Sequence, residues 1–261
     1  DNMIQLHNLK LSFKKSSITN YYEKRFFLRR SKNNKYITIS KNTHLYAKEN
    51  LPKKLIRNIY LLPNAISYKS YYNKIRKYKK DINIIYTASF VEKKNHSLAL
   101  KIIKIINKTH KVKLTLLGKG PTLEIIKKEA KELGVYDIIT FKGHVENVKK
   151  QLDNSNIYLH TAHYEPFGLV IIEAMANGLP VVTLNGGGNE DFIKNNKNGY
   201  IISSNDPQLF SNHIIKLFNN EALYQNISTQ GQNTAKNYDI NEYSKKLIEF
   251  YNEVIISEKL E

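Results

Sequence analysis

The sequence predicts an α/β protein built around a doubly wound parallel sheet. Short apolar runs rich in β-branched residues alternate with longer amphipathic stretches, turn residues bound most of these runs, and the pattern dominates residues 81–261. Strands that alternate with helices in this way lie parallel and are covered by helices on both faces. Ligands of such sheets bind at the carboxyl ends of the strands.

The pattern starts with a buried strand, INIIYTAS (82–89), and an amphipathic helix, SLALKIIKIINK (97–108). VKLTLLG (112–118) predicts the next strand, and PTLEIIKKEAKELG (121–134) predicts a helix with proline near its start and glycine after its end. Three more strands are expected at DIITFKG, NIYLHTA and PVVTLNG, followed by three helices with polar faces over residues 206–257.

Residues 1–63 have a different organisation. Strands are expected at NMIQLH, YITIS and NIYLLPN, a basic and aromatic helix at ITNYYEKRFFLRR, and one further short helix. So few strands do not make a stable domain alone. We therefore interpret residues 1–63 as the C-terminal part of a first domain whose beginning lies outside this sequence. Residues 64–80 would form the linker, and residues 81–261 the second domain, whose final helices would partly pack back on the first domain.

Positive charge is concentrated near the N-terminus. Residues 1–80 contain 20 Lys and Arg against three acidic residues, whereas residues 81–261 are almost balanced, although the whole chain carries +18. A local basic excess indicates an anionic partner, and a Lys-rich solvated face is the alternative. The chain has no cysteine, no signal-peptide core and no apolar run of bilayer length. A reducing, cytoplasmic compartment is therefore expected.

The stretch EPFGLVIIEAMANGLPVV (165–182) carries two glutamates eight residues apart. A helix is expected over residues 167–177, with Gly168 in its first turn, where exposed N–H groups suit a phosphate. Glu173 shares a helical stripe only with Leu169 and Asn177. Either that stripe faces water, or Glu173 binds hydroxyl groups of a ligand lying along the helix.

Other strand ends favour the second alternative. Lys94 follows the strand INIIYTASF and could neutralise a phosphate. The turns LLGKGP, with Gly118 and Gly120, and NGGGNED follow two further strands and let backbone approach a ligand. Together with the paired glutamates, these features predict a site for a nucleoside diphosphate.

At this point the sequence resembles the retaining glycosyltransferases of family 4, which have the GT-B fold of two facing Rossmann-like domains. EPFGLVIIEAMANGLPVV resembles their E-x7-E signature, IYLLPNAI their junction between domains, and TLLGKGP their L-x-I-x-G-x-G-P turn. NGGGNED and FIKNNKNGYII resemble two further family segments, in the same order. The resemblance covers nearly the whole chain.

The resemblance implies roles for the second-domain residues. Glu173 would hold the ribose hydroxyls, Glu165 would face the donor sugar, and Lys94 would bind the diphosphate. Backbone of Phe167, Gly168 and Leu169 would contact sugar and phosphate. The segment from Gly143 to Val145 would cradle the base, and Gly118 would lie in the second strand-end turn. His7 matches the first-domain histidine that points at the reacting sugar.

Two positions depart from the family pattern. Ser89 stands where an arginine usually helps to bind the diphosphate, so that contact would be missing or supplied elsewhere, for example by Lys93. Asp191 stands where a glutamate is more usual. His160 and His163 form an H-x-x-H pair without a clear third ligand, so no zinc site is expected. We expect His163 to be a neighbour of Glu165.

The resemblance implies a metal-independent, cofactor-free transfer of a sugar from a nucleotide sugar, UDP-linked, to a glycan or lipid-linked acceptor in envelope or capsule synthesis. Basic residues 10–57 would contact an anionic membrane surface at the inner face of the plasma membrane, and nucleic acid is not an expected partner. This chain alone would bind nucleotide with little or no turnover. The alternatives are a catalytically inactive GT-B-like partner subunit or nucleotide-binding fragment, and a nucleic-acid-binding protein supported by charge alone.

Overall fold

The computed structural model describes residues 3–6, 35–51, 53–74, 78 and 81–259. The chain forms two compact units. Unit 1 comprises residues 1–65 and 238–261, and unit 2 comprises residues 66–237. Part of what the sequence predicts lies outside the described residues, namely His7, the helix candidate ITNYYEKRFFLRR and residues 10–34 of the basic stretch.

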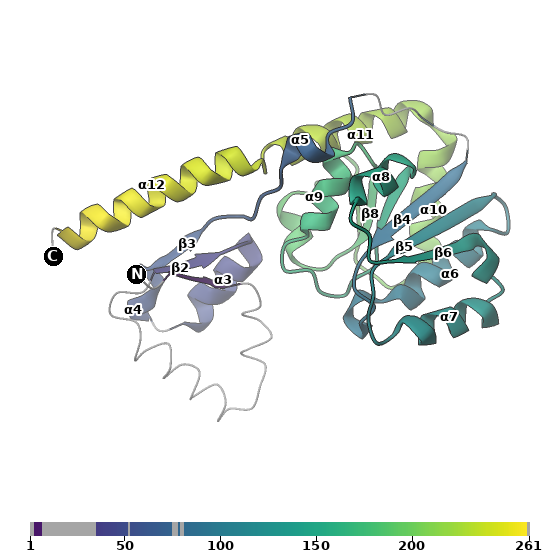
Figure 1. Cartoon of the computed structure of the whole chain (residues 1–261), viewed down its shortest axis with the longest axis horizontal. Helices are drawn as coiled ribbons and strands as arrows, with labels where there is room; N and C mark the ends of the chain where they lie inside the picture. Colours follow the sequence, from purple (N-terminus) through teal and green to yellow (C-terminus); the bar gives the residue numbers. More distant parts are fainter. Residues whose placement is uncertain (1–2, 7–34, 52, 75–77, 79–80, 260–261) are drawn as a thin grey trace. The chain divides into compact units, whose positions relative to one another are not determined.

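Unit 2 contains a six-stranded parallel sheet in the order β6-β5-β4-β7-β8-β9 (Figure 1). The strands are β4 (Ile82–Thr87), β5 (Val112–Leu117), β6 (Ile139–Gly143), β7 (Ile157–His160), β8 (Val181–Leu184) and β9 (Tyr200–Ile202). The chain builds outward from β4 to β6 and then returns to place β7 on the other side of β4. In such sheets ligands bind where the strand order reverses. This point lies between β4 and β7.

The helices of unit 2 connect these strands. They are α5 (Tyr68–Tyr71), α6 (His96–Ile106), α7 (Leu123–Glu132), α8 (Val148–Asp153), α9 (Leu169–Ala176), α10 (Pro207–Asn219) and α11 (Glu221–Lys236). Helix α6 packs against α10, and α9 packs against α11. Strand and helix residues share one buried core, which includes Ile84, Leu114, Leu159, Val182, Ile102, Phe210 and Ile214. The doubly wound α/β fold predicted from the sequence is confirmed.

Local signals set the helix boundaries. Asp206 accepts a hydrogen bond from the N–H of Gln208 at 2.8 Å, and Pro207 follows it at the start of α10. Asn220 does the same for α11 through the N–H of Leu223 at 2.9 Å. These N-caps satisfy backbone donors that have no partner within the helix.

Unit 1 has a smaller parallel sheet in the order β1-β2-β3, formed by β1 (Met3–Leu6), β2 (Lys35–Thr38) and β3 (Ile59–Leu61). Its helices are α3 (Lys41–Asn50), α4 (Lys53–Ile56) and α12 (Ile240–Lys259). One core cluster joins Tyr36, Ala47, Leu51, Leu55 and Ile59. A second joins Ile37 and Leu62 to Phe250, so α12 contributes to the core of this unit.

One boundary differs from the expected domains: residues 66–80, expected as linker, belong to unit 2. Of the three final helices, α12 belongs to unit 1, and α10 and α11 lie in unit 2. Hydrogen bonds explain the place of residues 66–80 in unit 2. The fully buried Asn177 donates to the carbonyl of Tyr71 at 3.1 Å, and Gln232 of α11 donates to the carbonyl of Asn73 at 2.9 Å. Within the described part of the chain, no helix combines the length and apolar character that a bilayer span requires.

Candidate functional site

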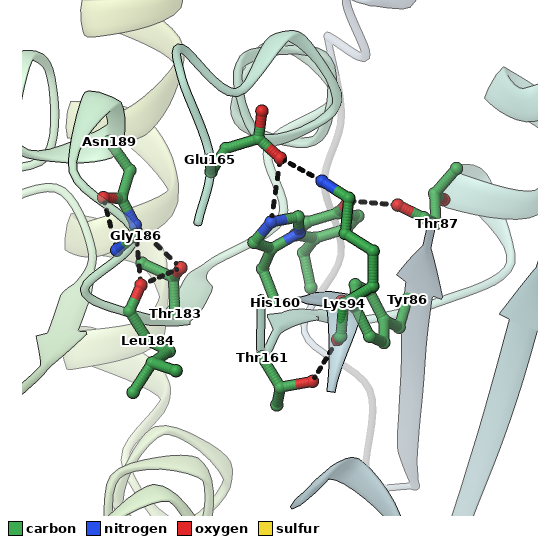
Figure 2. Close-up of polar contacts among 11 residues, drawn as sticks. Tyr86, Thr87, Lys94, His160, Thr161, Glu165, Thr183, Leu184, Gly186 and Asn189 are labelled. Atoms are coloured by element: carbon green, nitrogen blue, oxygen red, sulfur yellow. Dashed lines mark hydrogen bonds and ion pairs between the residues drawn. The ribbon is translucent and has the colours of Figure 1, made fainter. Parts of the chain in front are cut away.

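An ion pair lies at the point where the strand order of unit 2 reverses. Lys94 ends the short turn Glu92–Lys94 after β4, and Glu165 follows β7. The Lys94 Nζ and Glu165 Oε2 atoms are 2.6 Å apart, and their side chains are only 15% and 13% exposed (Figure 2). The structure thus brings together two residues that the sequence analysis assigned separately to a donor site.

Neighbouring hydroxyl groups fix the backbone of Lys94. The hydroxyl of Tyr86 in β4 donates to the Lys94 carbonyl at 2.5 Å. Thr161, just after β7, donates to the carbonyls of Lys94 at 3.3 Å and Asn95 at 2.8 Å. Asn95 has a left-handed backbone with a φ of 50°, which turns the chain into α6. The turn after β4 is therefore fastened to β7.

His160 completes a cluster with this ion pair. Its ring is fully buried, and its Nε2 lies 3.3 Å from the same Glu165 oxygen that contacts Lys94 (Figure 2). Burial lowers the pKa of His160, although Glu165 opposes this effect. Burial by itself would raise the pKa of Glu165, but His160 and Lys94 together override it and lower that pKa to about 2. Glu165 is therefore held as a carboxylate.

The glycine-rich loop after β8 holds the backbone of Glu165. The Glu165 N–H donates to the Gly186 carbonyl, and the Gly188 N–H donates to the Glu165 carbonyl, both at 2.8 Å. A Cβ at Gly188 would lie 2.1 Å from the carbonyl oxygen of Pro166, so only glycine fits this approach. The buried Asn189 closes the loop, accepting from Gly186 N–H and donating to Thr183 and Leu184 (Figure 2).

Helix α9 starts two residues later than the sequence predicted. Gly168, expected in the first turn, is the residue before the helix and has a φ of 104°, which favours glycine. No side chain caps this N-terminus. Leu169, the first helical residue, is half-buried, and Phe167 is buried. The backbone N–H groups of the first turn therefore start beside Glu165, where they could receive an anion.

Glu173 lies in the second turn of α9, in a different environment. Burial raises its pKa to about 7, and a hydrogen bond with the Tyr71 hydroxyl partly opposes the shift. The pKa of Tyr71 is raised to about 12, by burial first and then by Glu173. Glu173 is thus half-buried beside Tyr71, and its binding of ligand hydroxyl groups stays a prediction.

The remaining predicted residues lie in loops at the same edge of the sheet. The N–H of Gly118, after β5, donates to the carbonyl of Gly143, at the end of β6, at 2.7 Å. Gly118 has a φ of 135°, and a Cβ there would lie 2.0 Å from the Ala88 carbonyl oxygen. Ser89 is exposed beside this contact, and Val145 is half-buried. Backbone atoms of three strand ends thus adjoin one another.

Sequence reasoning missed two neighbours of the glutamates. His163, which we expected as a neighbour of Glu165, is exposed, and the buried His160 lies 3.3 Å from the Glu165 carboxylate. Tyr71 was assigned to a linker and gave no signal. The described residues contain no group of three or more metal-ligating side chains.

Comparison with known proteins extends these observations. The chain is 25% identical over 200 residues to the poly(ribitol-phosphate) alpha-N-acetylglucosaminyltransferase of Staphylococcus aureus, covering 76% of this chain and 40% of that protein. It is 30% identical over 135 residues to the poly(glycerol-phosphate) alpha-glucosyltransferase of Bacillus subtilis, covering 51% and 20%. The chain thus spans less than half the length of these curated relatives.

Solved structures share the fold. A TarM variant from Staphylococcus aureus bound to fondaparinux, alpha-GlcNAc-glycerol and UDP superposes with a TM-score of 0.81 at 20% identity, covering 96% of this chain and 50% of that one. HepE from Anabaena, bound to UDP and glucose, gives a TM-score of 0.83 at 16% identity, covering 96% and 71%. Residues 68–234 match the profile of the family "Glycosyl transferases group 1". Because this match covers more than half of the 261 residues, the chain belongs to the group 1 glycosyl transferases, which have the GT-B fold.

Proposed function

We propose that this chain contains the donor site of a retaining glycosyltransferase of family 4. The enzyme would transfer a sugar from a UDP-sugar to a glycan or lipid-linked acceptor in the synthesis of a cell-envelope or capsular polymer. The observation that carries the proposal is the Lys94–Glu165 ion pair at the reversal point of the sheet, beside the uncapped start of α9. Two relatives also support the proposal, because their names describe transfer of glucose and of N-acetylglucosamine to polyol-phosphate polymers.

The geometry supports a division of labour among these groups. Lys94 and the N–H groups at the start of α9 would bind the diphosphate, because both provide positive charge at one place. Glu165 would accept hydrogen bonds from hydroxyl groups of the donor sugar. Glu173 would give up its hydrogen bond with Tyr71 and accept hydrogen bonds from the ribose hydroxyls. The backbone from Gly143 to Val145 would cradle the base.

Catalysis would depend on positioning and on electrostatic stabilisation of the leaving group. The bond between the anomeric carbon and the diphosphate oxygen breaks, its electron pair leaves with UDP, and an acceptor hydroxyl takes the sugar and loses its proton. Lys94 and α9 would stabilise the charge that develops on the diphosphate, so we propose that no metal or other cofactor is required. The E-x7-E spacing would then place Glu165 and Glu173 to bind two parts of the donor nucleotide sugar.

The acceptor side of the proposal concerns unit 1 and the basic stretch. We propose that this part of the chain binds the acceptor, with His7 directed at the reacting sugar. Residues 10–57 would contact an anionic membrane surface from the cytoplasmic side, because clustered Lys and Arg are attracted to anionic lipid. Binding to vesicles with and without phosphatidylglycerol, at low and high salt, tests this part independently of the donor site.

The first experiment is a thermal-shift measurement with UDP, GDP, ADP and CMP on the wild-type chain, Glu173→Ala and Glu132→Ala. Glu132 is an exposed residue of α7 and serves as the matched control. A ligand at about 100 times its Kd stabilises the fold by roughly 2.7 kcal/mol. We expect a shift with UDP that disappears only in Glu173→Ala. If none of the four nucleotides shifts the melting temperature, the proposal is contradicted. Nucleotide binding without sugar transfer by a longer chain containing the whole first domain would instead support an inactive partner subunit.

A further inference from the structure

Two nitrogen atoms approach one oxygen of Glu165, and only the Lys94 contact has hydrogen-bond geometry. Both Lys94 Nζ at 2.6 Å and His160 Nε2 at 3.3 Å approach Oε2. Figure 2 shows the other carboxylate oxygen pointing away from both. The side chain is thus oriented by one oxygen and presents the second one elsewhere.

The side chains of Lys94 and His160 differ in how firmly they are held. Lys94 has a flexible four-carbon stem, so its ammonium group can turn toward another anion. His160 cannot, because its ring is fully buried between two tyrosines. The ring centroids are 5.3 Å from Tyr86, edge to face, and 6.3 Å from Tyr158, stacked.

A bound diphosphate would compete with Glu165 for Lys94. On the proposed function, Lys94 binds the diphosphate of the donor, so its charge would be drawn away from Glu165 as the site fills. A buried carboxylate that loses its only cation is strongly disfavoured. Some other group must then hold Glu165 while it contacts the sugar.

We propose that His160 is the positioning residue of Glu165, and that its Nε2–H holds the carboxylate in place when Lys94 turns to the donor diphosphate. This inference rests on the proposed function. The charged and titratable groups around the imidazole ring are Glu165, Lys94, His96, Tyr86 and Tyr158. Glu165 is the carboxylate among these groups, so it is the acceptor for a proton on Nε2. His96 is also buried, but it stacks on Phe90 at 4.1 Å and contacts no carboxylate among the described residues.

The first test needs no ligand. Nitrogen-15 NMR of the imidazole groups of the wild-type chain shows which ring nitrogen of His160 carries the proton, with Glu165→Gln used for assignment. The proposal requires a proton on Nε2, and a neutral ring protonated only on Nδ1 would overturn it. Because this measurement uses the wild-type chain, it does not depend on whether a variant folds.

The second test separates sugar from nucleotide. Calorimetric titrations with UDP, UDP-glucose and UDP-N-acetylglucosamine are made on the wild type, His160→Leu, His160→Gln and the control His96→Leu. In His160→Leu we expect the affinity for the bound UDP-sugar to fall by about tenfold or more, as for loss of a hydrogen bond to a charged group, while UDP binding is unchanged. Glutamine keeps an N–H donor and should restore the affinity.

The outcomes distinguish this inference from the proposed function. The role of His160 would be overturned if His160→Leu lost the same affinity for UDP and for UDP-sugar. It would also be overturned if this variant bound both ligands as tightly as the wild type does. So would a loss of the same size in His96→Leu, because that result would indicate a general packing effect. If the wild-type chain binds none of the three ligands, the proposed function is overturned instead. The nitrogen-15 NMR measurement would still show whether His160 carries the Nε2 proton that it needs to donate to Glu165.

Discussion

Two glutamates at α9 have opposite pKa shifts. Glu165 precedes the helix and Glu173 lies in its second turn, and both are largely buried. The pKa of Glu165 is lowered to about 2 because Lys94 and His160 outweigh the effect of burial. The pKa of Glu173 is raised to about 7 because burial is opposed only by Tyr71. Because both carboxyl groups are buried, the opposite pKa shifts come from their neighbours: Lys94 and His160 beside Glu165, and only Tyr71 beside Glu173.

The two states have opposite consequences for stability. A carboxyl group whose pKa is lower in the folded state stabilises the fold above its unfolded pKa of about 4.5, and this contribution is lost as the pH falls toward 2. A group whose pKa is raised has no effect below about 4.5 and destabilises the fold increasingly as the pH rises through 7. Glu165 thus contributes to stability at neutral pH, and Glu173 costs stability there.

The largest expected effect comes from removing the cation of Glu165. Lys94→Met leaves a buried carboxylate beside a neutral histidine, so we expect a loss of about 3–5 kcal/mol of unfolding free energy at pH 7. Urea unfolding measures it. The double variant Lys94→Met/Glu165→Gln should recover most of the loss. A loss below about 1 kcal/mol would mean that the pair behaves as an exposed one.

The second-largest effect comes from removing the destabilising charge of Glu173. Glu173→Gln keeps the shape of the side chain without its charge, so at pH 8 the variant should be about 2–3 kcal/mol more stable than the wild type. At pH 4.5 the difference should be close to zero, because the wild-type carboxyl is then protonated in the fold. Unfolding curves across this pH range test the prediction, with Glu132→Gln as the exposed control. A gain that does not depend on pH would contradict the raised pKa.

A third change disturbs Glu165 through its backbone and spares Glu173. In Gly188→Ala the new methyl group would meet the Pro166 carbonyl at 2.1 Å, so the turn holding Glu165 must shift. We expect a loss of about 1–3 kcal/mol in unfolding free energy. Gly231→Ala in α11 is the matched control, because its Cβ would lie 3.6 Å from the nearest atom. Equal effects of the two substitutions would refute the role of the loop.

The smallest effect concerns the hydrogen bond of Glu173. Tyr71→Phe removes the donor that opposes burial, so the pKa of Glu173 should rise further and stability at pH 8 should fall by about 1 kcal/mol. The neighbouring Tyr72→Phe provides the control, because Tyr72 is 40% exposed and stacks on Tyr68. NMR titration of the Glu173 carboxyl measures the shift. An unchanged pKa in Tyr71→Phe would show that Tyr71 does not reach the carboxylate.

Most of the second unit could be predicted because its signals are local. The apolar run INIIYTAS became β4, and the alternation of strands and helices implied a parallel sheet with its site at the carboxyl edge. Gly168 was placed inside the helix because composition does not reveal backbone conformation. Its φ of 104° makes it the residue before α9 instead.

The site could be predicted only in part. Lys94 and Glu165 were recognisable from their positions after strands, but their direct contact across 71 residues depends on how two side chains meet. His160 and Tyr71 could not be identified, because a histidine in a strand and a tyrosine in a polar stretch have many ordinary roles. Their importance arises from the tertiary structure, which places each beside one glutamate.

The way the chain divides between the units determines an order of assembly during synthesis. Unit 2 is one continuous segment, so all of its residues have left the ribosome once Asn237 has emerged. Unit 1 is interrupted by it, and the apolar contact of Ile37 and Leu62 with Phe250 must wait for α12. The nascent protein would therefore make all residues of the candidate donor site first, and would keep part of its other core uncovered until α12 is made.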